Sequence, residues 1–367
     1  MGYLFILITS WFNTLYIKGK GYLVAILAFA WMAYLGGAAS AFTTLDYANY
    51  ATYYQLTAAG VDVRLEWLYT LLSRRAVIVG LDYAQFRLIL FGVTFAILFV
   101  AVIRLTELPV LFAACFMLFP FFDEVTQVRS FVAYSIALLA TSFLSRLSLK
   151  RILVFEALIV LAIGFHSSAG VFVLLPLLQY AVQKTSPAHA ARVVDIVMIV
   201  FALFLLVFSK INFLVNLIAK LLLFVSSEST SNSFLSLMAQ QTGSKKFFLE
   251  VFIGYWLFKK LILWAGKDNP KAISANVYSL FLLGQLLLPL LLISDQMQRL
   301  PRLGIEAAIL IIGTLVATEV SKSKRAQQVI LLTLGLVLVN AFFYYGLLEP
   351  SAPFPTSIPY LAHFYES

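Results

Sequence analysis

Charged residues are scarce in this chain of 367 residues. They make up 12% of it, while 62% is hydrophobic, whereas soluble globular domains carry about 25% charged residues. This composition excludes a soluble globular protein and predicts a polytopic membrane protein. The apolar runs are continuous and do not alternate with polar residues, which favours membrane-spanning helices over an outer-membrane barrel. Cysteine occurs once, at Cys115, which excludes an intrachain disulfide and a cysteine-based metal cluster.

Familiar catalytic motifs are missing as well. The sequence contains no P-loop, GxSxG, HExxH or CxxC pattern, and no DxD or DD pair of the kind found in metal-dependent sugar-nucleotide transferases. We therefore expect neither a metal nor another cofactor. The first 17 residues lack the basic start and the cleavage site of a signal peptide, so we expect them to be a mature span.

The apolar runs predict an all-α protein with about twelve transmembrane helices in a single integral membrane domain, residues 1–367. The expected spans are 2–17, 21–38, 85–103, 108–122, 131–145, 152–165, 168–182, 193–208, 247–265, 273–293, 304–320 and 327–345. Three segments are expected on the outer side: 39–84, a polar loop at 209–246 and a tail at 346–367. The spacing of leucine and arginine over residues 62–87 predicts an amphipathic helix on the outer membrane surface, with Glu66 and Arg87 pointing inward.

Basic residues set the expected orientation. With the N-terminus outside, the inner connections hold 15 of the 26 lysines and arginines and five acidic residues, a net charge of +10 against −1 outside. The charge of +9 on the whole chain is thus expected to anchor the inner face to membrane lipid, and no nucleic-acid partner is expected.

One polar stretch interrupts the apolar runs in the middle of the chain. Residues 163–170 join the runs 152–165 and 171–182 and predict the tight turn of a helical hairpin. His166, one of three histidines, lies at its tip. A histidine in this position is either a structural cap or an acid, base or anion donor facing a polar cavity.

Arginines on the same predicted side are the next candidates. Arg129 begins a helix rich in small residues, and it either reaches the headgroups, pairs with Asp123 or belongs to a site with His166. Arg299 and Arg302 lie three residues apart at an outer turn. Two planar donors on one helical face are suited to binding a diphosphate.

A tyrosine stripe precedes these segments. Tyr47, Tyr50 and Tyr54 share one face of a predicted helix, where their rings could stack on sugars while Asp46 and Asn49 bind hydroxyl groups. The alternative is an aromatic belt at the membrane surface.

Five segments, in this order, resemble the EpsG-like branch of the Wzy polysaccharide polymerases: TTLDYANY, EWLY, VRSFVAYSIA, FHSSAGVFVLLP and MQRLPRLGIEAA. Arg129 with Ala133, and His166 with Ser167 and Ala169, carry the resemblance best.

The resemblance implies a bacterial inner-membrane enzyme similar to the GT-C class of glycosyltransferases. It would join undecaprenyl-diphosphate-linked oligosaccharide repeats into an O-antigen or exopolysaccharide at the periplasmic face, releasing undecaprenyl diphosphate. Chain-length regulators and flippases are possible partners. His166, Asp46 and Glu66 would then be the catalytic acid–base candidates, and Arg129, Arg299 and Arg302 would bind the diphosphate.

Two other functional classes remain open. A flippase for lipid-linked oligosaccharides would need polar residues through the middle of the bilayer, where this chain has few. A membrane O-acyltransferase would also use a membrane histidine, but its acyl-donor machinery would face the cytoplasm, whereas His166 is expected outside. An O-antigen ligase would share the chemistry and differ only in its acceptor.

Overall fold

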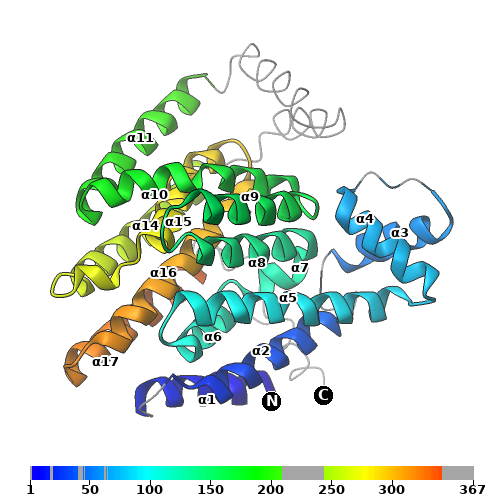
Figure 1. The fold of residues 1–367 in the computed structure, drawn as a ribbon, viewed down its shortest axis with the longest axis horizontal. Helices are drawn as coiled ribbons and strands as arrows, with labels where there is room; N and C mark the ends of the chain where they lie inside the picture. Colours follow the sequence, from blue (N-terminus) through cyan, green and yellow to red (C-terminus); the bar gives the residue numbers. More distant parts are fainter. Residues whose placement is uncertain are drawn as a thin grey trace.

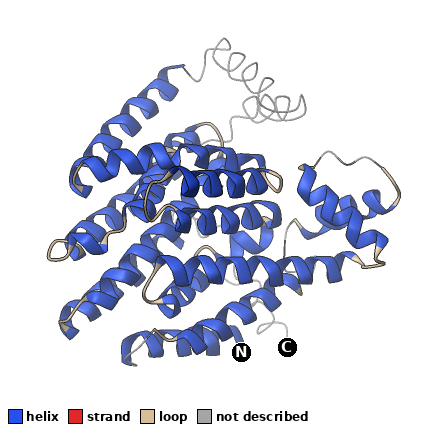
Figure 2. Cartoon of the chain, viewed as in Figure 1, coloured by secondary structure: helices blue, strands red, loops and turns tan. Residues whose placement is uncertain are grey.

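Helices form nearly all of the structure, a computed structural model that describes residues 2–16, 20–39, 44, 46–61, 63, 65–208 and 244–340. This part of the chain contains no strand (Figure 2). In chain order the helices are α1 (Gly2–Tyr16), α2 (Tyr22–Gly37), α3 (Tyr47–Ala58), α4 (Trp67–Ile78), α5 (Tyr83–Leu105), α6 (Pro109–Leu118), α7 (Phe121–Thr126), α8 (Val128–Phe143), α9 (Leu149–Ile163), η1 (Ser167–Leu174), α10 (Leu175–Lys184), α11 (Pro187–Phe208), α14 (Lys245–Ala265), η2 (Pro270–Ala272), α15 (Ala275–Leu286), η3 (Leu288–Leu292), η4 (Asp295–Gln298), α16 (Arg299–Thr318) and α17 (Lys322–Asn340).

The predicted all-α fold is confirmed, and each of the twelve predicted spans contains a helix. By length and hydropathy, four helices of the described residues can cross a membrane: Tyr83–Leu105, Pro187–Val207, Ala275–Leu292 and Arg299–Thr318. The number of twelve crossings stays a prediction. The predicted loop 209–246 lies outside the described residues except for its last three, where Ser244 caps α14, and the predicted tail 346–367 lies wholly outside them.

The single amphipathic helix expected over residues 62–87 is wrong. α4 ends at Ile78, and Gly80 adopts a positive φ of 84° that terminates it. Asp82 then begins α5 with a capping box, in which its side chain and that of Gln85 each accept a bond from the other's backbone N–H. Arg87 therefore belongs to α5, where it is fully buried as expected.

α16 is the most enclosed of the four long apolar helices, and it crosses α15 at two glycines. A Cβ atom on Gly304 would lie 3.1 Å from the Cα of Gly284, so the two backbones are in direct contact. The Tyr255 hydroxyl lies against both glycines and donates to the Pro301 carbonyl. This packing fixes the N-terminal end of α16, from which Arg299 and Arg302 project.

The bundle has two chemically different ends. α3 and α4 lie at one end, on the right in Figure 1, where the backbone N–H of Leu68 donates to the Gly164 carbonyl. At the other end Lys20, Glu107, Lys271 and Arg325 line one cavity. Connections that are rich in basic residues thus come together at the end away from His166.

Candidate active site

The turn that carries His166 is held by α4. α9 ends at Ile163, and a Cβ atom on Gly164 would lie only 2.8 Å from the side chain of Leu68. The glycine lets α4 approach closely enough for its Leu68 N–H to reach the Gly164 carbonyl at 2.9 Å. As a result Glu66, which directly precedes α4, lies beside the hairpin turn.

His166 caps the helix that follows it. Its Nδ1 accepts from the Ser168 backbone N–H at 3.3 Å and lies 2.7 Å from the Ser168 hydroxyl, which in turn lies 2.9 Å from the hydroxyl of Tyr134. The structural-cap alternative is therefore realised, although the ring's other nitrogen, Nε2, points away from this cap. That nitrogen lies 3.3 Å from Nη1 of Arg299.

A second set of contacts adjoins the first through Glu66. One carboxylate oxygen of Glu66 accepts from the Ser167 backbone N–H at 3.2 Å, and the other pairs with Nη1 of Arg129. Arg129 also donates from Nε to the Tyr50 hydroxyl at 3.4 Å. We call His166, Glu66, Arg129, Arg299 and Tyr50 the His166 cluster. It brings together segments separated by more than 200 residues of sequence.

The positive charges around His166 suppress its protonation. Burial, Arg129 and Arg299 together lower the pKa of His166 to about 3. The imidazole is therefore neutral at physiological pH. If Nδ1 accepts from Ser168, the ring proton is on Nε2 and faces the N–H of Arg299, so that two donors converge on one point. Two N–H donors that face each other at 3.3 Å repel, and an anion bound beside them would accept from both.

Arg302 lies in a different environment from Arg299. It is fully buried, its Nη1 is 2.8 Å from Asp123, its Nε is 3.2 Å from Glu124, and its Nη2 donates to Gln127. The alternative pairing of Arg129 with Asp123 is wrong, because Asp123 pairs with Arg302 and Arg129 pairs with Glu66. Burial raises the pKa of Glu124, and Arg302 opposes that rise. The ion pairs of Arg302 with Asp123 and Glu124 hold α7 against α16. Removing one partner would leave a buried, unpaired charge, which is strongly destabilising.

The tyrosine stripe of α3 faces the protein. Tyr50 and Tyr54 are 8% and 6% exposed, and their rings pack against Tyr69, Tyr83 and Phe86 with centroids 5.4 to 6.0 Å apart. The ring of Tyr47 lies against Tyr83 and under the guanidinium of Arg87. This packing covers the faces that were expected to stack on sugar.

The polar residues of α3 lie differently. Asn49 is exposed on the opposite side of α3. Asp46 is the N-cap residue of that helix, yet its carboxylate makes no capping bond there, and its charge acts on Arg299.

Several polar neighbours were not expected from the sequence: Ser168, Tyr134, Gln127, Glu124 and Glu306. Glu306 is buried and interacts electrostatically with Glu124 and Arg302. One signal was present, because Arg302 and Glu306 are four residues apart in an apolar run and so share a helical face. Among the described residues, no group of three or more histidine, cysteine, aspartate or glutamate side chains is arranged to hold a metal ion.

Comparison with known proteins adds one finding. The model of the EpsG family matches residues 21–360, nearly the whole chain. No curated protein and no solved structure matches this chain.

Proposed function

The chain belongs to the EpsG family, a family of Wzy-like polysaccharide polymerases, and on this premise we propose that it joins lipid-linked oligosaccharide repeats into a bacterial polysaccharide. The donor is a growing glycan on undecaprenyl diphosphate, and a second lipid-linked repeat is the acceptor. An acceptor hydroxyl attacks the anomeric carbon, the new glycosidic bond forms, and undecaprenyl diphosphate leaves. The diphosphate already activates the donor, so the reaction needs no nucleotide.

The proposal places the protein in the bacterial inner membrane as a multi-pass, GT-C-like enzyme with about twelve crossings. Its apolar helices support a membrane location. The segregation of basic connections to the end away from His166 supports an active site at the periplasmic face, because basic loops favour the cytoplasm.

One observation carries the assignment: Arg299 contacts His166 while Arg129 and Glu66 adjoin the same turn. We assign diphosphate binding to Arg129 and Arg299, whose guanidinium groups would stabilise the negative charge that develops on the leaving group. His166, as the neutral tautomer with its proton on Nε2, would donate a third bond to the same anion. A bound diphosphate would also offset the charges of both arginines and so raise the proton affinity of His166.

Glu66 is the base that best suits this arrangement. In the structure its carboxylate is held by Arg129, and a diphosphate on Arg129 would compete for that bond and release it. The released carboxylate would accept the proton of the attacking hydroxyl. Asp46, within electrostatic reach of Arg299, is the alternative base.

The remaining predicted residues take supporting roles in this proposal. Arg302 would hold α16 in position through Asp123 and Glu124. Tyr50 would orient Arg129 through its hydroxyl. Of the residues expected to contact the glycan, the exposed Asn49 is best placed to do so, with Tyr47 beside it, while Tyr54 would stabilise the packing of α3.

The test is chain growth by the purified protein on a synthetic undecaprenyl-diphosphate repeat. We expect a ladder of products from the wild type, and none from His166→Ala or Arg129→Ala. His189→Ala and Arg104→Ala are matched controls, because both side chains are exposed and lie outside the His166 cluster. Unchanged ladders in both site variants would remove these residues from the mechanism. Transbilayer movement of the repeat without chain growth would indicate a flippase instead.

A further inference from the structure

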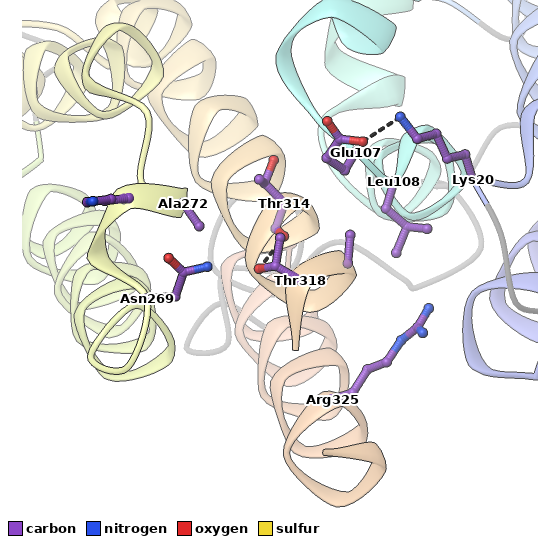
Figure 3. A pocket seen from close by; sticks show the side chains of 10 residues that line it. Lys20, Glu107, Leu108, Asn269, Ala272, Thr314, Thr318 and Arg325 are labelled. Atoms are coloured by element: carbon purple, nitrogen blue, oxygen red, sulfur yellow. Dashed lines mark hydrogen bonds and ion pairs between the residues drawn. The ribbon is translucent and has the colours of Figure 1, made fainter. Parts of the chain in front are cut away.

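A second charged site lies at the far end of α16 from the His166 cluster. The helix has 20 residues and is therefore about 30 Å long. Arg299 begins it beside His166, and Thr314 and Thr318 in its last turns line a cavity of about 570 Å³. Figure 3 shows the cavity between Lys20 and Glu107 on one side and the segment that follows α14 on the other.

The lining of this cavity is basic. Among the described residues, Lys20, Lys271 and Arg325 line it with a single carboxylate, Glu107. Glu107 pairs with Lys20 across the rim, but both side chains are about half exposed, at 51% and 48%. An ion pair so exposed contributes little stability, and an incoming anion can compete for the lysine.

Arg325 has N–H donors that remain available to a ligand. Its Nη2 donates to the Thr14 carbonyl at 3.4 Å, a weak bond, while its buried Nε has no hydrogen-bond partner in the part of the chain that the structure describes. Thr314 and Thr318 lie on the same cavity wall, where their hydroxyls donate to the helix carbonyls of Leu310 and Thr314 and keep their lone pairs as acceptors. Leu108, the N-cap residue of α6, also lines the cavity, so the positive end of that helix dipole faces it.

We propose that this cavity binds a phosphate group. One guanidinium and two ammonium groups provide charged donors for the phosphate oxygens. The lining carries an excess of two positive charges, which suits a phosphate mono- or diester. The volume falls within the range of small-molecule sites, roughly 300–1,000 Å³, and leaves room for a glycerol headgroup. The proposal is independent of the polymerase reaction.

The phosphate can belong to an anionic phospholipid or to a soluble metabolite. The cavity lies where the basic connections gather, and basic pockets between membrane helices commonly bind anionic headgroups. The two sources are separated by the probe that binds.

The test is equilibrium binding to the purified full-length protein in a neutral detergent. The probes are short-chain phosphatidylglycerol, phosphatidylcholine with the same acyl chains, and glycerol phosphate. We expect phosphatidylglycerol to bind more tightly than phosphatidylcholine, and both Arg325→Gln and Lys271→Gln to weaken binding about tenfold, as the loss of one charge-assisted bond predicts. Lys322→Gln, an exposed lysine of α17 outside the lining, should change nothing.

The binding results distinguish a soluble phosphate from a phospholipid, and they can overturn the proposal. Binding of glycerol phosphate with the same dependence on Arg325 would make a soluble phosphate the ligand, and binding of phosphatidylglycerol alone would make it a lipid. Equal affinity in the wild type, Arg325→Gln and Lys271→Gln would overturn the proposal, as would equal binding of the two lipids together with no binding of glycerol phosphate. Lys271 is exposed on a short connection, so its replacement should leave folding intact.

Discussion

Arg129 and Glu66 lie at the boundary between protein and solvent, with 20% and 19% of their side chains exposed. Partial burial strengthens their attraction relative to a surface pair, while the exposed part leaves both accessible to a ligand. The pair is therefore neutral when the site is empty, and the site gains a free carboxylate when an anion occupies Arg129.

Replacing Glu66 by Gln tests this exchange, in which a diphosphate displaces the Glu66 carboxylate from Arg129. The variant lacks the carboxylate that competes with the diphosphate, so it should bind undecaprenyl diphosphate at least as tightly as the wild type. Chain growth should fall by about 100-fold or more, the usual effect of losing a general base. Binding and turnover are measured on the same preparation. Weaker binding in Glu66→Gln would contradict the exchange, and unchanged turnover would assign the base to Asp46.

His166 makes a prediction about pH. Its pKa in the folded protein is about 3, below the ordinary value of about 6.5. Between these values the unfolded chain binds more protons than the folded one, so stability is full above about pH 6.5 and falls as the pH is lowered towards 3. Between pH 7 and pH 5 the contribution lost is about 2 kcal/mol.

The comparison that isolates this contribution is with His166→Asn. Its thermal unfolding temperature should fall less between pH 7 and pH 5 than that of the wild type. Burial raises the pKa of groups such as Glu124, so their protonation stabilises the folded protein as the pH falls. This contribution is the same in the wild type and in His166→Asn. Identical losses would mean that burial, Arg129 and Arg299 do not hold His166 neutral.

The sequence alone identifies some residues of the candidate site and not others. His166, Arg129 and Arg299 stand out because polar groups on an apolar background need a partner or a function. Arg299 and Arg302 look equivalent in sequence, three residues apart on one face. Only the packing of α7 against α16 shows that Asp123 and Glu124 take Arg302, and such a contact between distant segments leaves no local pattern.

At the scale of elements, the crossing of α15 and α16 decides where Arg299 lies. Gly284 and Gly304 bring the two backbones together, as small residues do in membrane helix pairs. The Tyr255 hydroxyl stabilises the crossing by donating a hydrogen bond to the Pro301 carbonyl. Any separation of these helices would displace the first turn of α16 from the hairpin turn that carries His166.

Gly304→Ala should therefore destabilise the protein and reduce chain growth together. The added Cβ would lie 2.1 Å from the Tyr255 hydroxyl and 3.1 Å from a backbone atom of Gly284. We expect overpacking to cost about 1–3 kcal/mol, measured as a lower unfolding temperature. Gly92→Ala is the matched control, because a Cβ there meets nothing within 4 Å in the described structure, and it should be neutral or slightly stabilising. Equal effects of the two substitutions would contradict the role of the crossing.

The helices themselves were largely predictable, because long apolar runs leave few other structures possible in a membrane. The boundary between α4 and α5 is not visible in the apolar spacing, which continues from Leu72 through Ala76 to Val79. Gly80 and the Asp82–Gln85 capping box interrupt the helix there, and these local signals outweigh the periodicity.

At the scale of the whole molecule, charge separates the two ends. The His166 cluster joins Glu66 with two arginines at one end, and the cavity beside Thr314 gathers lysines and Arg325 at the other. The sequence predicted this division from loop charges alone. It could not predict which of these charges meet, since the contacts of α4, α8 and α16 with the hairpin depend on the packing of the entire bundle.

Labelling with a membrane-impermeant thiol reagent tests the orientation. Cys115 is fully buried, so it should give little background, and Cys115→Ala removes it. In intact cells Ser167→Cys should react and Lys271→Cys should not, because the first is proposed to face the periplasm and the second the cytoplasm. Both are exposed and should react once the membrane is dissolved. The reverse pattern in cells would place the His166 cluster on the cytoplasmic side.

The central claim is that Arg129 and Arg299 bind one diphosphate beside His166. Its most direct test is the affinity of undecaprenyl diphosphate for the wild type, Arg129→Gln, Arg299→Gln and the exposed control Arg104→Gln. We predict that each site variant raises Kd by about 10- to 100-fold, the loss of one or two charge-assisted bonds, while Arg104→Gln leaves Kd unchanged. Equal affinity in all four proteins would contradict the account.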